Sequence, residues 1–171
     1  MKPIYYLKRA HSEQGFTLIV ALILLLILTV VAVTQVSFNT MVTRIATNSA
    51  DALVAFQTAE GALNQAANQL LASTYTPSNF ISNSNGLYLF NANNAPLWTT
   101  VNWSSAGAVI SSYQGNSNAQ GAYIIEQLPS VTMPGQNMSK PTLIYRITAR
   151  AVGASGNGLI ILQATVQVPQ L

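Results

Sequence analysis

The feature that most limits how this chain can fold is an uncharged apolar segment near its N-terminus. Residues 16–34 read FTLIVALILLLILTVVAVT, with no charged residue, no Gly and no Pro. A helix of this length can span a bilayer. Its Leu, Ile, Val and Phe side chains together favour insertion by roughly 4 to 8 kcal/mol. The segment therefore predicts a membrane helix, because the core helix of a soluble protein is apolar on one face only.

The charges that flank this segment predict its orientation. Lys2, Lys8 and Arg9 precede it, and the next basic residue is Arg44. Because cytoplasmic flanks carry an excess of Lys and Arg, we expect a single pass with the N-terminus inside and the C-terminus outside. A secretory signal would have a shorter apolar core followed by small residues at a cleavage site, so this class does not fit.

The remaining charge excludes several classes of function. The chain has 171 residues, of which 6% are charged, a net charge of +3 and no cysteine. Without cysteine, thiolate and disulfide chemistry are not expected. DNA binding is not expected either, because after Gly15 only Arg44, Lys140, Arg146 and Arg150 are basic. His11, the only histidine, lies before Gly15. A Ser-His-Asp triad or a histidine metal site is therefore not expected in the rest of the chain.

Only three carboxylates follow Gly15, namely Asp51, Glu60 and Glu126. Their spacing does not suggest the converging pair that glycosidase chemistry needs. The asparagine-rich loops NSNG and NANN offer carbonyl oxygens to calcium, but a calcium site also wants several carboxylates, so turn formation explains them better. We expect no catalytic residue, no cofactor and no metal site, and the chain is not expected to be an enzyme.

The helix is expected to continue beyond the apolar segment. Residues 36–73 contain one Gly and no Pro and are rich in Ala, Gln and Leu. Apolar or small residues recur mostly three or four apart and predict one packing stripe, formed by Val42, Ala46, Ser49, Leu53, Phe56, Leu63, Ala67 and Leu70. A helix over residues 16–73 would be ~85 Å long, so we expect its upper part to pack on a globular head.

The head is expected to be a sheet. Helix signals end at residues 73–77, and β-prone runs follow at residues 87–90, 97–103, 123–128, 143–152 and 159–168. The last two runs flank the glycine-rich turn GASGNG and predict a hairpin. One strand face is apolar, with Tyr145, Ile147, Ala149 and Ala151, and the other carries Arg146, Thr148 and Arg150. The apolar face should meet the helix stripe, which gives an α+β fold with one helix on an antiparallel sheet.

The string QGFTLIV, with its short basic leader and long apolar helix, resembles the class III signal of type IV prepilins. In that family a prepilin peptidase cuts after the glycine and methylates the new N-terminus, which implies cleavage after Gly15 and N-methylation of Phe16. The strings AFQTAEGAL, from Ala55 to Leu63, and YRITARAVGASGNGLIILQAT, from Tyr145 to Thr165, resemble PilX-type minor pilins. The resemblance covers somewhat over a third of the chain.

This resemblance implies a pilin-like organisation. Residues 1–15 would be a cleaved leader, 16–35 the transmembrane and assembly helix, 36–73 its amphipathic continuation and 74–171 the β-rich head. The assembly helix would pack through Phe16, Leu18, Val20, Leu24 and Leu28. The family's usual glutamate at the fifth mature position is Val20 here. Within lipid an unpaired carboxylate costs on the order of 2 to 3 kcal/mol, so valine removes both this cost and a docking contact.

A subunit without that glutamate resembles the minor pilins at a fibre tip. The function implied is a non-enzymatic minor pilin that helps to initiate or cap a type IV pilus, with roles in adhesion and twitching motility. A minor pseudopilin of a type II secretion system shares the leader, helix and head and stays open as an alternative. So does an uncut signal-anchored envelope protein whose head binds a ligand.

Partners and location follow from the same resemblance. The partners implied are other minor pilins, the major pilin, the inner-membrane assembly machinery and the prepilin peptidase, with a large tip adhesin as a further candidate. The subunit would lie in the bacterial inner membrane before assembly and in the extracellular pilus afterwards. We expect no nucleic acid partner.

Side chains outside the anchor supply candidate subunit contacts. Glu60 either pairs with a neighbouring subunit or an arginine of the head, or is a solvated helix position. Arg146 and Arg150, four residues apart on one strand face, either bind an acidic partner or form a solvated charged face. The aromatic residues of the loops act as contact anchors or fill the core, and they are Trp98, Trp103 and Tyr113.

Overall fold

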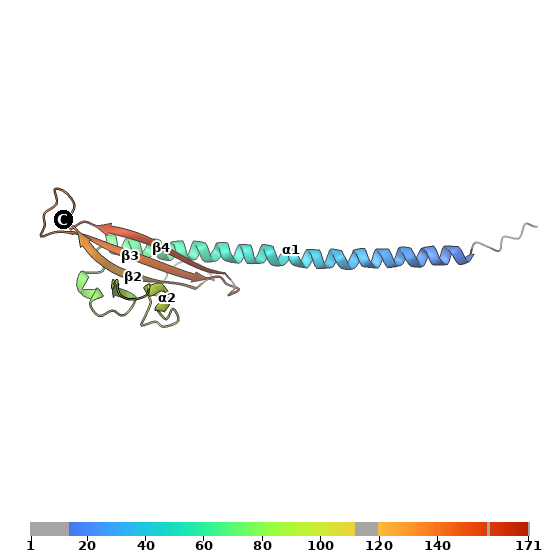
Figure 1. The fold of residues 1–171 in the computed structure, drawn as a ribbon, viewed down its shortest axis with the longest axis horizontal. Helices are drawn as coiled ribbons and strands as arrows, with labels where there is room; N and C mark the ends of the chain where they lie inside the picture. The colour runs from blue at the N-terminus through green and yellow to red at the C-terminus, as the bar shows by residue number, and fades with distance from the viewer. Residues whose placement is uncertain (1–13, 112–119, 157, 171) are drawn as a thin grey trace, which may run out of the picture. The chain divides into compact units, whose positions relative to one another are not determined.

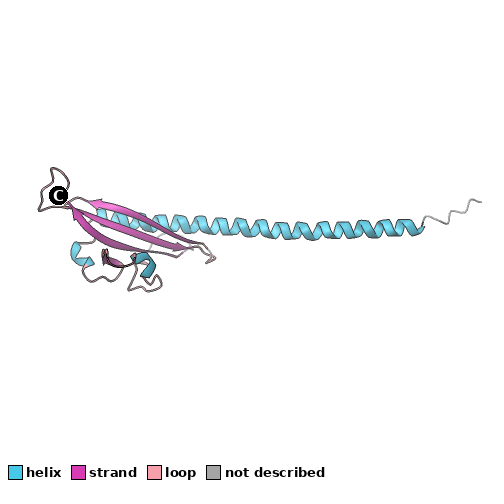
Figure 2. Cartoon of the chain, viewed as in Figure 1, coloured by secondary structure: helices cyan, strands magenta, loops and turns pink. Residues whose placement is uncertain are grey.

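The computed structural model describes residues 14–111, 120–156 and 158–170 of the chain. Its elements are α1 (Gln14–Leu71), the 3-10 helix η1 (Pro77–Phe80), β1 (Leu87–Leu89), α2 (Leu97–Thr100), β2 (Gln120–Val131), β3 (Thr142–Val152) and β4 (Leu159–Val168). Figure 2 shows this α+β content as one dominant helix and a sheet. Internal contacts divide the chain into two units, residues 1–46 and 47–171.

The first unit is helical over its described part. Every residue of α1 from Gly15 to Ala46 is exposed, although this stretch contains the apolar segment. The hydroxyl of Thr29 donates a hydrogen bond of 2.7 Å to the Leu26 carbonyl. Threonine is tolerated in an apolar helix for this reason, since its polar group is satisfied by its own backbone. The expected helix over residues 16–73 is confirmed to within two residues at each end.

The second unit is built on a four-stranded sheet in the order β1-β2-β3-β4. Figure 1 shows β2, β3 and β4 side by side, with the C-terminal part of α1 along one face. The expected hairpin is confirmed, because β3 and β4 pair continuously from Leu143↔Val168 to Val152↔Leu159. β1, however, is parallel to β2, so the sheet is mixed and not purely antiparallel. The connection over residues 90–119 is long enough for the crossover that parallel strands need.

Two expected strands differ from those observed. β2 was expected over residues 123–128 but continues to Val131, past a register shift between Leu128 and Val131. Pro129 lies in this shift, and it has no N–H to give to a ladder. The strand expected over residues 97–103 is wrong, since its start forms α2, a single helical turn after Pro96. The Thr99 hydroxyl and N–H both donate to the Pro96 carbonyl, so local hydrogen bonds override β propensity here.

The core lies between α1 and one face of the sheet. The predicted apolar face of β3 is confirmed, because Tyr145, Ile147, Ala149 and Ala151 are at most 2% exposed. Tyr145, Ile147 and Ala149 form one buried cluster with Ala62, Ala66, Leu70, Phe80, Leu87, Tyr123 and Ile125. The Tyr123 hydroxyl donates to Gln69 Oε1 at 2.7 Å, and burial raises the pKa of Tyr123 to about 12.

The helix face that packs on this sheet agrees with the expected stripe only near its C-terminal end, where Leu70 is buried and Leu63 and Ala67 pack against the core. Leu53 and Phe56 of the predicted stripe are 58% and 43% exposed. The buried positions are mostly small residues, namely Ala55, Thr58, Ala59, Ala62 and Ala66, and they end at the expected Leu70. Small side chains let a helix approach a sheet closely, so the large ones are turned away from it.

Residues 81–111 cover the second face of the sheet over β2 and β3, while β4 is exposed on that face. Ile124 and Thr148, which point to this face, are fully buried. The Tyr88 hydroxyl donates to the Ala108 carbonyl at 2.8 Å and ties the segment together. Gly86, with φ of +78°, is required at its start, because a Cβ there would lie 2.8 Å from the backbone nitrogen of Ile110. This covering places the aromatic residues of the segment over the arginines of β3.

Candidate functional site

The predicted processing and assembly residues lie in the first turns of α1. Gly15 is exposed, and Phe16 is 71% exposed. Leu18, Leu24 and Leu28 expose 55–72% of their surfaces. Val20 is the least exposed residue of the set at 37%, and no acidic residue occurs between it and Asp51. These side chains need an apolar environment that the described part of the chain does not supply.

One helix in the described chain is long and apolar enough to cross a membrane, and it is α1. Its most apolar 18-residue window has a mean hydropathy of 3.2, and none of that window is buried. A buried core helix would show the opposite. The basic leader residues Lys2, Lys8 and Arg9 lie outside the described residues.

Asp51 ties α1 to the β3–β4 turn, a role that sequence reasoning missed. Its carboxylate accepts hydrogen bonds from the Ser155 N–H at 3.0 Å, the Ser155 hydroxyl at 2.7 Å and the Gly158 N–H at 3.0 Å. These bonds, led by that of the Ser155 hydroxyl, hold the pKa of Asp51 below its ordinary value of 3.8. Gly153 is needed beside it, because an added Cβ would collide with the Asp51 carboxylate. Acid and glycines lie about a hundred residues apart, so no local pattern reveals the contact.

Arg146 is held within the chain and is not a solvated charge. It lies opposite Glu126 on β2, and its Nε and Nη2 atoms each donate to a Glu126 carboxylate oxygen at 2.8 Å. Glu126 is only 3% exposed. The guanidinium also lies over the Phe90 ring, 5.1 Å from its centroid. A two-pronged arginine–carboxylate pair of this kind fixes geometry as well as charge.

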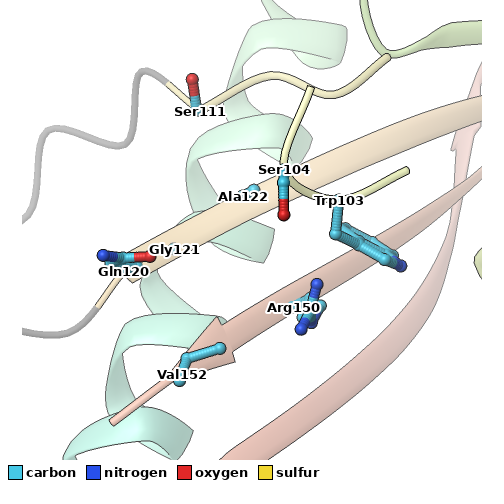
Figure 3. A pocket seen from close by; sticks show the side chains of 8 residues that line it. All are labelled: Trp103, Ser104, Ser111, Gln120, Gly121, Ala122, Arg150 and Val152. Atoms are coloured by element: carbon cyan, nitrogen blue, oxygen red, sulfur yellow. The ribbon is translucent and has the colours of Figure 1, made fainter. Parts of the chain in front are cut away.

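Arg150 has a different environment on the same strand face. Its guanidinium carbon lies 5.7 Å from the centroid of the Trp103 ring. The two side chains line a pocket of about 320 Å³ whose other walls are Ser104, Ser111, Gln120, Gly121, Ala122 and Val152 (Figure 3). The only salt bridge among the described residues is that of Arg146, so Arg150 has no carboxylate partner there.

The other candidate contacts are scattered. Glu60 is exposed on α1, and Trp98 is 42% exposed, so Trp98 does not fill the core. Trp103 is half-buried, and its indole N–H donates to the Trp98 carbonyl at 3.1 Å. Tyr113 lies outside the described residues.

The asparagines of the loops form turns, as expected. Asn83 Oδ1 accepts a hydrogen bond from the Leu89 N–H at 2.8 Å, and Asn91 Oδ1 accepts one from the Asn93 N–H at 3.0 Å. These side-chain oxygens are therefore used to shape the backbone. No group of three or more His, Cys, Asp or Glu residues that could hold a metal ion occurs in the described ranges.

The sequence of the chain matches two known protein families. Residues 56–168 match the family of the type IV pilus assembly protein PilX, C-terminal part, and residues 14–64 match the PilX N-terminal family. Neither a curated protein nor a solved structure gives a match. The first match alone spans more than half of the chain, and together the two matches include the strings QGFTLIV, AFQTAEGAL and YRITARAVGASGNGLIILQAT. The chain belongs to the PilX family of type IV pilus assembly proteins.

Proposed function

We propose that this chain is a non-enzymatic minor pilin that helps to initiate or cap a type IV pilus, and that its pili serve adhesion and twitching motility. The observation that carries the proposal is the exposure of the whole apolar part of α1 in a member of this family. Such a surface suits lipid before assembly and a bundle of sister helices after it.

Processing is part of the proposal. A prepilin peptidase would remove residues 1–15 after Gly15 and N-methylate Phe16. The basic leader supports an inner-membrane orientation with the N-terminus in the cytoplasm, followed by transfer of the subunit into the extracellular pilus. Residues 16–35 would then be the assembly segment, 36–73 its amphipathic continuation and 74–171 the head.

Val20 supports a place at the start of the fibre. The glutamate usual at this position in pilins pairs with the N-terminus of a neighbouring subunit, and valine cannot make that pair. A subunit that nothing precedes does not need it. The packing contacts would come from Phe16, Leu18, Leu24 and Leu28 together with Val20. The proposed partners are other minor pilins, the major pilin, the inner-membrane machinery and, at the tip, a large adhesin.

Deletion of the gene tests the proposal. We expect loss of surface pili and of twitching with protein secretion intact, and restoration of both by the wild-type gene. Loss of exoprotein release with pili intact would instead assign the chain to a type II secretion system. A complementing variant with Val20→Glu should restore fewer pili than wild type if valine matches a leading position.

A further inference from the structure

β3 carries two arginines that each lie over an aromatic ring, and in the part of the chain that the structure describes only one of them is also paired with a carboxylate. Arg146 stacks on Phe90 and is neutralised by Glu126, while Arg150 stacks on Trp103 and has no carboxylate in the described chain. The two arginines are four residues apart and point to the same face of the sheet. The environments of the two arginines therefore differ in the carboxylate, which Arg150 lacks among the described residues.

The strand register shows where the missing acid would lie. Glu126 is the cross-strand partner of Arg146, and the cross-strand partner of Arg150 is Ala122. Directly opposed residues have Cβ atoms only about 5 Å apart, so Ala122 stands where a carboxylate would reach the guanidinium. Ala122 lines the 320 Å³ pocket. Ala122 and Arg150 thus border the same open space (Figure 3), whereas at the first position the pocket of about 220 Å³ beside Arg146 already has Glu126 in its wall.

The chain cannot easily supply the acid itself. It contains four acidic residues. Asp51 binds the β3–β4 turn and Glu126 binds Arg146. Glu60 belongs to α1, the helix on the opposite face of the sheet, and Glu13 precedes that helix. Residues 112–119, with the sequence SYQGNSNA, contain no acidic residue.

We propose that this pocket receives an aspartate or glutamate side chain from another protein of the pilus assembly. Arg150 would hold the carboxylate as Arg146 holds Glu126, and Ser104, Ser111 and Gln120 offer polar groups at the walls. A protein source is favoured because the family works by contact with other pilus components. The identity of the partner therefore rests on the proposed function, whereas the recognition of a carboxylate does not.

Trp103 provides a direct readout in the full chain in detergent micelles. Trp98 and Trp103 are the only tryptophans, so Trp98→Phe leaves Trp103 as the sole indole and keeps the carbonyl that it binds. The probes are the capped tripeptides Ala-Glu-Ala and Ala-Gln-Ala. We expect a saturable fluorescence change with the glutamate peptide and at least ~tenfold weaker binding of the glutamine peptide, because a charge-assisted bond is lost.

Variants separate a specific site from general attraction. Arg150→Gln should abolish the response, while Lys140→Gln, which removes one exposed positive charge elsewhere, should leave it unchanged. Ala122→Glu should also abolish it, by giving Arg150 an internal partner. Its folding is checked by comparing it with Ala122→Gln: the glutamate variant should unfold at the higher temperature, and the difference should vanish with Arg150→Gln.

Three results would overturn the proposal. Equal binding of the two peptides, an unchanged response in Arg150→Gln, or tighter binding of glucuronate than of the glutamate peptide would each do so, the last by assigning the pocket to an acidic sugar. In cells, Arg150→Gln and Ala122→Glu should lower piliation and Lys140→Gln should not. If gene deletion left pili intact while the peptide results held, the proposed function would fail and the carboxylate site would stand.

Discussion

The two parts of α1 have opposite kinds of apolar surface. From Phe16 to Val33 most side chains are large and apolar and all are exposed, so they need an apolar partner that the described residues do not supply. From Asp51 to Leu70 the buried face is mostly alanine, and its partner is the chain's own sheet. The difference teaches that length and hydropathy identify the first part, whereas small size at three- and four-residue spacing identifies the second.

The largest effect should come from charging the first part. Leu24→Arg together with Leu28→Arg should cost about 6 kcal/mol of insertion free energy, comparable to all that the segment gains. We expect loss from the membrane fraction, measured by carbonate extraction. Leu24→Ala with Leu28→Ala is the matched control and should remain inserted. If the Arg variant stayed in the membrane, the apolar part of α1 would not be the membrane anchor.

A cavity in the core of the head should lower the stability of the head without changing membrane insertion of the apolar part of α1. Ile147→Ala should lower the free energy of unfolding by about 2 to 5 kcal/mol, because this side chain is fully buried. Denaturant unfolding followed by tyrosine and tryptophan signals measures it. Ile161→Ala, on the exposed side of β4, should cost much less, and membrane insertion should be normal in both variants. Equal losses would contradict the core described above.

The third prediction tests the helix face itself. Ala62→Leu should destabilise the head by about 1 to 3 kcal/mol, since there is no room between helix and sheet. Leu53→Ala, a loss of bulk on the exposed side of the same helix, should change stability by no more than about 0.5 kcal/mol. If the order were reversed, the packing stripe expected from the sequence would be the correct one.

The smallest effect concerns the link between α1 and the β3–β4 turn. Because the folded pKa of Asp51 is lowered, its stabilisation is present above its ordinary value of 3.8 and is lost as the pH falls through the lower folded value. Between about pH 5 and pH 3 the free energy of unfolding, measured with urea at each pH, should fall more for wild type than for Asp51→Asn. Glu60→Gln removes an exposed acid from the same helix and should behave as wild type. Parallel pH curves for wild type and Asp51→Asn would argue against the link.

Much of the fold was predictable because its signals are local or periodic. The long helix, the hairpin around GASGNG and the apolar face of β3 follow from uninterrupted helix formers, glycines and alternation. The buried helix face was predicted correctly at Leu63, Ala67 and Leu70 but missed at the preceding turns, because a stripe of large residues was assumed there and alanines carry little hydrophobic signal. The turn at Leu97 was missed because one proline and two threonines decided it.

The candidate site was predictable only in part. The sequence singled out Arg146 and Arg150 as a pair, but their difference depends on which β2 residue lies opposite each one. β2 lies about twenty residues away in the sequence, so only the observed strand pairing shows that Glu126 is opposite Arg146 and Ala122 opposite Arg150. Asp51 likewise acts across the whole head, on a turn that no local motif connects to it.

The most direct test of the pilin assignment is the mass of the mature protein isolated from membranes or sheared pili. We expect a chain that begins at Phe16 with a methylated amino group. A protein that retains Lys2, or that starts elsewhere with an unmodified terminus, would contradict the assembly role proposed for the apolar part of α1.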